Sequence, residues 1–264
     1  MTEPLLKVSG ITKRFGGFTA LERVDLTVAR GERLGLIGPN GSGKSTLVNC
    51  ISGTLRNDEG SIRFAGHDLG GEPPHRRVRL GLARSFQIPK PFASMSVLDN
   101  LRIPLLYAAR QHEKLVSERI VEEAMEVLRQ VGLADKAHAM SRGLTQVDMR
   151  KLELARAMAA EPKLLMADEA MAGLSHSEVT DIVSLLISDE AMAGLSASEV
   201  DDILVLLSGL KQHGVAVIMI EHVMRAVMKF SDRIAVLVAG RKIADSDPQS
   251  IVNNVEVVTA YLGE

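Results

Sequence analysis

Residues 38–46 read GPNGSGKST and stand between an apolar segment at 34–37 and a second apolar segment at 47–51. Glycines in such a loop let the backbone turn tightly enough for successive N–H groups to point at one phosphate, and the lysine adds a positive charge. The hydroxyl of Ser45 is placed to bind Mg²⁺, and the amino end of the following helix adds partial positive charge. This strand–loop–helix pattern predicts a site for a nucleoside triphosphate such as ATP. The predicted site residues here are Gly38, Pro39, Asn40, Gly41, Ser42, Gly43, Lys44, Ser45 and Thr46.

The length of 264 residues and the hydrophobic fraction of 46% suit one large α/β domain, or one domain with a subdomain. The longest apolar runs, at 215–220 and 234–238, are the size of a strand and far short of the ~20 residues that span a bilayer. The amino terminus lacks the pattern of an export signal. We therefore expect a cytoplasmic protein that does not itself cross a membrane.

The charge pattern gives no reason to expect a nucleic acid partner, because the net charge is −2. A local basic cluster is predicted to be the solvated face of a helix. Its members are His75, Arg76, Arg77, Arg79 and Arg84. Cys50 is the single cysteine, which excludes a disulfide within the chain, and we interpret it as a small buried thiol.

Four further signals follow in a fixed order around the glycine-rich loop. Phe15 precedes it in KRFGG, and Gln87 follows in ARSFQIPKPF. An apolar segment then ends in two carboxylates at 164–169, LLMADE, and His222 follows another apolar segment in VIMIEHV. With these signals, almost the whole chain resembles the ATP-binding subunit of an ABC transporter.

The resemblance implies a role for each of these side chains. Phe15 would stack on adenine, although a ring can equally serve the core. Gln87 would sense Mg²⁺ and the attacking water, Asp168 would hold Mg²⁺ through water, and Glu169 would polarise the attacking water. His222 would contact the γ-phosphate, although a lone histidine is more often structural. The implied catalytic residues are thus Lys44, Gln87, Glu169 and His222, and the implied Mg²⁺ residues are Ser45, Gln87 and Asp168.

Within that family the chain is most similar to subunits of branched-chain amino-acid importers. The stretches that carry this similarity are FQIPKPFASMSVLDNL, DEAMAGL and the terminal AYLGE. The resemblance implies a second ATPase subunit, identical or different, beneath two membrane permease subunits, with an external solute-binding protein as an indirect partner. The protein would lie on the inner face of the membrane. Importers of other solutes use similar subunits, so the resemblance does not identify the solute.

One departure from the family pattern lies at 144–148, where LTQVD replaces the signature LSGGQ. In the family this motif meets the γ-phosphate bound to the opposite subunit. Thr145 keeps a hydroxyl, but Gln146 and Val147 each add a Cβ where the backbone must approach phosphate closely. We expect a weakened contact, although a tolerated variant of the motif remains an alternative.

A second departure is a tandem repeat, in which residues 168–188 are followed by a similar segment at 189–209. It offers two candidate catalytic pairs, Asp168/Glu169 and Asp189/Glu190, of which only one can face the glycine-rich loop. The first pair is favoured because a short link connects it to the preceding helix. An extra surface helix is expected from the other copy.

The expected architecture is an α/β fold of the P-loop ABC ATPase type with three parts. These are a parallel core sheet, an antiparallel β subdomain and a helical subdomain at about 88–160, all in one ATP-binding domain. Strands are predicted at 5–12, 24–28, 33–37, 61–64, 163–167 and 215–220, with an amphipathic helix at 117–131. Three rival functions are an ABC ATPase acting without a membrane partner, a regulatory pseudo-ATPase and a small-molecule kinase.

Overall fold

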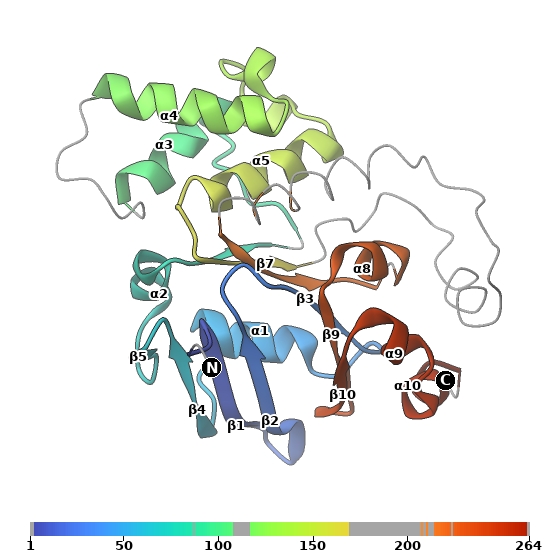
Figure 1. The fold of residues 1–264 in the computed structure, drawn as a ribbon. Helices are drawn as coiled ribbons and strands as arrows, with labels where there is room; N and C mark the ends of the chain where they lie inside the picture. The colour runs from blue at the N-terminus through green and yellow to red at the C-terminus, as the bar shows by residue number, and fades with distance from the viewer. Residues whose placement is uncertain are drawn as a thin grey trace.

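The computed structural model describes residues 3–86, 88–107, 117–168, 214–222 and 224–262, together with Leu207 and Leu210. Two sheets and a group of helices make up this part of the chain (Figure 1). Gln87, Glu169 and most of the tandem repeat lie outside the described residues.

The larger sheet contains six of the described strands, in the order β10-β9-β3-β8-β7-β6. Strand β3 pairs in parallel with β8 and β9, and β7 pairs in parallel with β6 and β8, whereas β10 is antiparallel to β9. Strands β7 and β8 are buried at every residue, as expected for parallel strands covered on both faces, and their sequences are accordingly almost entirely apolar. The prediction of a parallel core sheet is confirmed. The bounds are β3 Arg33–Ile37, β6 Leu82–Ser85, β7 Leu164–Asp168, β8 Ala216–Ile220, β9 Arg233–Val238 and β10 Arg241–Ser246.

The smaller sheet is antiparallel, as predicted, with the order β2-β1-β4-β5 among the described strands. Its strands are β1 Leu6–Phe15, β2 Phe18–Val28, β4 Glu59–Phe64 and β5 His67–Asp68. Strands β1 and β2 extend beyond the predicted limits because they continue to a tight turn that pairs Phe15 with Phe18. Two glycines, Gly16 and Gly17, form that turn, and Gly16 has a positive φ.

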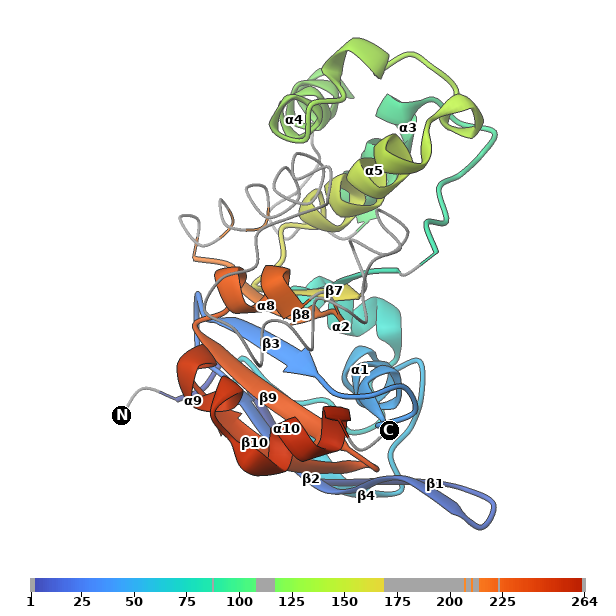
Figure 2. The same ribbon diagram turned by 90° about the vertical axis from the view of Figure 1, so that its right-hand side faces the viewer.

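Helix α1, Lys44–Ser52, packs between the two sheets (Figures 1 and 2). Its buried side chains share one apolar core with Val8 of β1, Leu26 of β2 and Ile218 of β8. The glycine-rich loop is therefore held between β3 and a helix whose apolar face is fully enclosed.

Three helices form a separate cluster, shown at the top of Figure 1: α3 Val97–Tyr107, α4 Ser117–Gln130 and α5 Gln146–Met158. They have an apolar core of their own, which includes Leu101, Leu128 and Leu152. Helix α4 matches the predicted amphipathic helix to within one residue. Leu154 and Ala157 of α5 instead join the core beneath the six-stranded sheet, so α5 connects the helical cluster to the sheet.

Helix α2, Pro74–Leu80, precedes β6, and three further helices follow β8: α8 Met224–Phe230, α9 Pro248–Val252 and α10 Val255–Leu262. Phe230 of α8 and Val257 of α10 pack in one cluster with Val236 of β9, which covers the second face of the sheet. None of the helices within the described ranges is long and apolar enough to span a bilayer.

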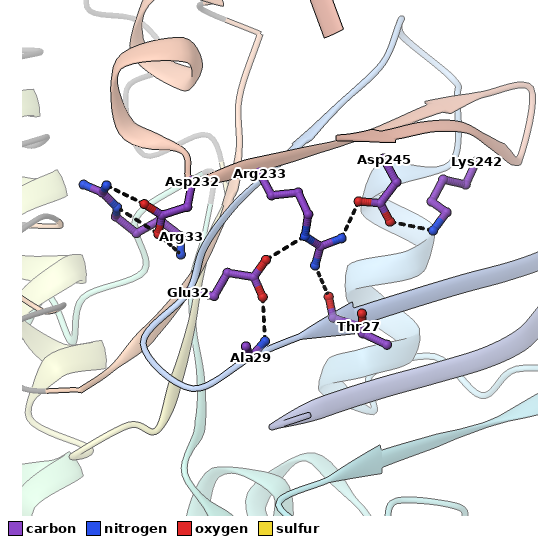
Figure 3. A network of polar contacts seen from close by, with 8 residues as sticks. All are labelled: Thr27, Ala29, Glu32, Arg33, Asp232, Arg233, Lys242 and Asp245. Carbon is purple, nitrogen blue, oxygen red and sulfur yellow. Dashed lines mark hydrogen bonds and ion pairs between the residues drawn. The ribbon is translucent and has the colours of Figure 1, made fainter. Parts of the chain in front are cut away.

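A polar network ties the segment before β3 to the β9–β10 hairpin (Figure 3). Arg233 donates to Glu32 at 2.7 Å and to the carbonyl oxygen of Thr27 at 2.6 Å, and it also pairs with Asp245. Glu32 in turn accepts a hydrogen bond from the N–H of Ala29. The tip of this hairpin contacts the glycine-rich loop, since the N–H of Gly240 donates to the carbonyl oxygen of Ser42 at 3.0 Å. The network therefore helps to hold the hairpin in place against that loop.

Candidate functional site

The glycine-rich loop follows β3 directly and depends on two close backbone contacts. A Cβ on Gly38, which has φ +149°, would lie 2.0 Å from the carbonyl oxygen of Leu237 on β9. A Cβ on Gly43, with φ +102°, would lie 2.7 Å from the carbonyl oxygen of Ala20 on β2. Glycine is required at both positions, because neighbouring backbone fills the space and the conformation disfavours side chains.

Lys44 begins α1 and extends its ammonium group back across the loop. Its Nζ donates hydrogen bonds to the carbonyl oxygens of Gly38 at 2.6 Å and Pro39 at 3.0 Å. Gly43, at the N-cap, supplies no side-chain hydrogen bond to the first turn of α1. The loop therefore presents an ammonium group and the amino end of a helix, which is the donor set that phosphate groups require.

A cavity of about 320 Å³ opens beside the loop. Lys44 and Ser45 of the loop line this cavity, together with Phe15 and Phe18. Both rings are largely exposed, 48% for Phe15 and 63% for Phe18, so neither belongs to the core. The expected site residue Phe15 thus lines the cavity. Phe18 is not among the site residues predicted from the sequence. The sequence FGGF was a signal for it, because a two-glycine turn pairs the residues on either side and so brings Phe18 next to Phe15.

The carboxyl ends of three adjacent parallel strands meet at the same edge of the sheet. Ile220 at the end of β8 is in register with Leu36 of β3 on one side and with Asp168 of β7 on the other. Asp168 is only 5% exposed, and His222 lies two residues beyond the end of β8 and is half-buried. This edge is the usual ligand site of an open α/β sheet, and it brings together segments that are far apart in the sequence.

Two expected site residues, Gln87 and Glu169, lie outside the described residues. Asp168, the first residue of the first repeat copy, is placed at the end of β7. The roles expected for Gln87 and Glu169 stay predictions.

The prediction of a solvated basic face at 75–84 was wrong for two of its five members. Arg77 is buried and donates to the carbonyl oxygens of Cys50, Ile51, Leu69 and Glu72. Arg84 lies on β6, where its guanidinium pairs with Asp168. Helix α2 is too short to reach residue 84, and a guanidinium enters the interior when oxygen acceptors surround it.

The altered stretch at 144–148 forms the start of α5. Thr145 is the N-cap, and its Oγ1 accepts a hydrogen bond of 3.1 Å from the N–H of Asp148. Burial acts to raise the pKa of Asp148, but hydrogen bonds from Lys136 and Thr145 hold that pKa below its usual range. An ionised carboxylate in the first turn of α5 therefore occupies the helix end that a phosphate would otherwise favour.

The chemistry of the site fits a triphosphate and Mg²⁺. The hydroxyl of Ser42 is buried in the loop with no hydrogen-bond partner among the described residues, so it can serve a bound phosphate. Ser45 and Asp168 offer the oxygen ligands that Mg²⁺ prefers. Within the described ranges no group of three or more His, Cys, Asp or Glu could hold a metal ion by itself.

Fold and site together define a P-loop nucleotide-binding protein: a glycine-rich loop between β3 and α1, with Asp168 at the end of a nearby parallel strand. The chain belongs to the ABC transporter family, whose profile matches residues 21–172, and it is of the ATP-hydrolysing class. The expected fold class is confirmed.

Relatives match over the full length. The chain is 35% identical to the high-affinity branched-chain amino acid transport ATP-binding protein BraF of Pseudomonas aeruginosa, over 100% of both chains. It is 36% identical to the probable branched-chain amino acid transport ATP-binding protein LivG of Archaeoglobus fulgidus, over 98% of this chain and 95% of that one. An ATP-binding cassette of an ABC transporter in its ADP conformation superposes with a TM-score of 0.80 at 30% identity, covering 100% of both chains. These comparisons give no support to the alternative of a regulatory pseudo-ATPase.

Proposed function

We propose that the chain is the ATP-hydrolysing subunit of a membrane importer for branched-chain or related amino acids. The observation that carries this proposal is the phosphate-binding loop with Lys44, at the same edge of the sheet as Asp168, in a chain whose full-length relatives carry that transport function in their names. The solute is taken from those names, because the site itself recognises only the nucleotide.

Each part of the site has a proposed task. The N–H groups of the loop and Lys44 bind the phosphates, while Phe15 and Phe18 offer aromatic faces to the base. Ser45 and Asp168 would hold Mg²⁺, and the bound ion would neutralise charge on the transferred phosphoryl group. Glu169 would polarise the attacking water, Gln87 would sense Mg²⁺ and that water, and His222 would contact the γ-phosphate. Catalysis would rest on electrostatic positioning rather than on covalent chemistry.

Transport would require partners. We propose that two ATPase subunits meet head to tail around bound nucleotide, and that their closure moves two permease subunits at the inner face of the membrane. A solute-binding protein delivers the amino acid from outside. The second ATPase subunit is either an identical copy of this chain or a different one.

The permease contact is proposed to lie between α2, β6 and the helical cluster. A cavity of about 320 Å³ opens there, with Phe86, Ile103, Tyr107 and Arg156 among its lining residues. Phe86, Phe92 and Tyr107 are exposed aromatic side chains around this region. Exposed aromatic rings beside a hollow are typical of a surface that receives a partner helix.

The test is ATP-driven uptake of labelled leucine by the subunit assembled with its permeases in vesicles. Lys44→Ala should reduce phosphate release and uptake together, by about 10²–10³-fold, because it removes the charge that contacts phosphate. Lys7→Ala, at an exposed position on β1, is the matched control and should change neither. ATP hydrolysis stimulated by another solute and not by leucine, isoleucine or valine would contradict the proposed substrate.

A further inference from the structure

Arg84 links two parts of the candidate site that are far apart in the chain. It lies on β6, whose neighbour in the sheet is β7. Its Nη2 donates to Oδ2 of Asp168 at 2.5 Å, and its Nη1 donates to Oδ1 of Asn49 at 2.6 Å. The guanidinium also lies 5.3 Å from the centre of the Phe86 ring. The ion pair with Asp168 is well shielded from water, since the side chain of Arg84 is 13% exposed and that of Asp168 is 6% exposed.

The two acceptors belong to the two elements that carry the proposed Mg²⁺ ligands. Asp168 ends β7, and Asn49 lies on α1 four residues after Ser45. Residues four apart lie on the same face of a helix, so the contact with Asn49 fixes the side of α1 that carries Ser45. The guanidinium of Arg84 therefore connects α1, the helix that carries Ser45, to the carboxylate of Asp168.

We propose that Arg84 is a positioning residue for Mg²⁺, which sets the distance between Asp168 and Ser45. This inference rests on the proposed function, in which these two residues hold the ion. The planar guanidinium suits the task because its donors point in fixed directions, whereas an ammonium group directs none of its bonds so rigidly. Arg84 engages Oδ2 of Asp168. The second carboxylate oxygen, Oδ1, would then be the one that serves Mg²⁺.

The rival explanation is an ion pair that only stabilises the fold. Removing Arg84 leaves a buried carboxylate without its cation, which destabilises a protein whether or not the site binds a metal. Loss of stability alone therefore does not separate the two roles. The Mg²⁺ concentration that half-saturates nucleotide binding does separate them, because a purely structural ion pair has no reason to change it.

The experiment measures binding of a fluorescent ATP analogue to the purified chain while Mg²⁺ is titrated, and again in EDTA. Arg84→Lys keeps the positive charge and loses the planar set of donors, and Arg84→Met loses both. Both should raise the half-saturating Mg²⁺ concentration about 10–100-fold, the usual effect of removing a group that orients a metal ligand. Binding in EDTA should be unchanged. Asn49→Ala should raise the half-saturating Mg²⁺ concentration less, because this substitution removes only the contact between Arg84 and α1.

Arg79→Met serves as the control, because Arg79 is an exposed arginine on the nearby α2. It should leave the Mg²⁺ dependence unchanged. Thermal unfolding without nucleotide identifies any variant that fails to fold, and Arg84→Lys together with Asn49→Ala then carry the test. Unchanged or tighter Mg²⁺ dependence in folded Arg84 variants would overturn the proposal. Absence of MgATP binding by the unaltered chain would instead overturn the proposed function and this inference with it.

Discussion

The Nη1 atom of Arg77 donates a hydrogen bond of 2.8 Å to the backbone carbonyl oxygen of Cys50, in the last turn of the helix that follows the phosphate-binding loop. The same guanidinium reaches the carbonyl oxygen of Ile51 at 2.8 Å. It therefore adds a donor to the last carbonyl groups of the helix, of which that of Cys50 also accepts from the N–H of Gly53. It also places positive charge at the negative end of the helix dipole.

Arg77→Met should lower the free energy of unfolding by about 2–3 kcal/mol, because it removes the buried hydrogen bonds from this guanidinium to backbone carbonyl oxygens, including those of Cys50 and Ile51 in α1. Urea unfolding monitored by circular dichroism measures the change. Arg79→Met, at an exposed position on the same helix, should change the unfolding free energy by no more than about 0.5 kcal/mol. Equal effects of the two substitutions would show that Arg77 does not hold the end of α1.

The thiol of Cys50 should be inert in the folded protein. Burial raises its pKa from 9.0 to about 11, so almost none of the reactive thiolate is present near neutral pH. Iodoacetamide should modify Cys50 at pH 8 only after unfolding in urea. Rapid labelling of the native protein would contradict the buried position.

The same pKa gives a pH dependence of stability. The contribution of Cys50 is fully present below pH 9, the unfolded value, and is lost as the pH rises through 9 towards 11, because the unfolded thiol ionises first. The loss is on the order of 3 kcal/mol. Cys50→Ala should lack this component, so the difference in unfolding free energy between the two proteins should shrink over that pH interval.

The start of α5 offers a test of the altered stretch at 144–148. Gln146→Gly with Val147→Gly should raise ATP turnover several-fold in the assembled transporter, because it restores close backbone approach to phosphate. It should also lower the unfolding free energy by about 1–2 kcal/mol, since glycine disfavours a helix. Turnover is measured as phosphate release.

Arg129→Gly, at an exposed position of α4, is the matched control for the cost of glycine and should leave turnover unchanged. If the double variant shows the expected loss of unfolding free energy but unchanged turnover, LTQVD is a tolerated variant of the signature motif.

The tandem repeat can be resolved by comparing its two glutamates. Glu169→Gln should lower phosphate release by at least about 10²-fold while ATP still binds, because Glu169 directly follows the last residue of β7 and is the proposed residue that polarises water. Glu190→Gln, at the equivalent position of the second copy, should retain turnover. The reverse result would assign the catalytic position to the second copy.

Much of the fold could be predicted from local patterns. Strand β3 has the predicted bounds, and α4 differs from its prediction by one residue. Both could be predicted because apolar periodicity and glycine spacing are patterns of residues that are close together in the sequence. Strand β6 was not anticipated. Its sequence LARS is short and half polar, and it becomes a strand only because β7 pairs with it.

The loop at 38–46 and the apolar segments around it were sufficient, by sequence alone, to predict a nucleotide site in an α/β protein, because a phosphate cradle is built from consecutive residues. Only the tertiary structure decided which distant residues join it. Phe18 enters through the pairing of two strands, and Arg84 reaches Asp168 across two adjacent strands and Asn49 on a third element. From sequence alone, a basic residue such as Arg84 is predicted to be solvated. Burial of its charge becomes favourable only where the tertiary structure surrounds it with oxygen acceptors.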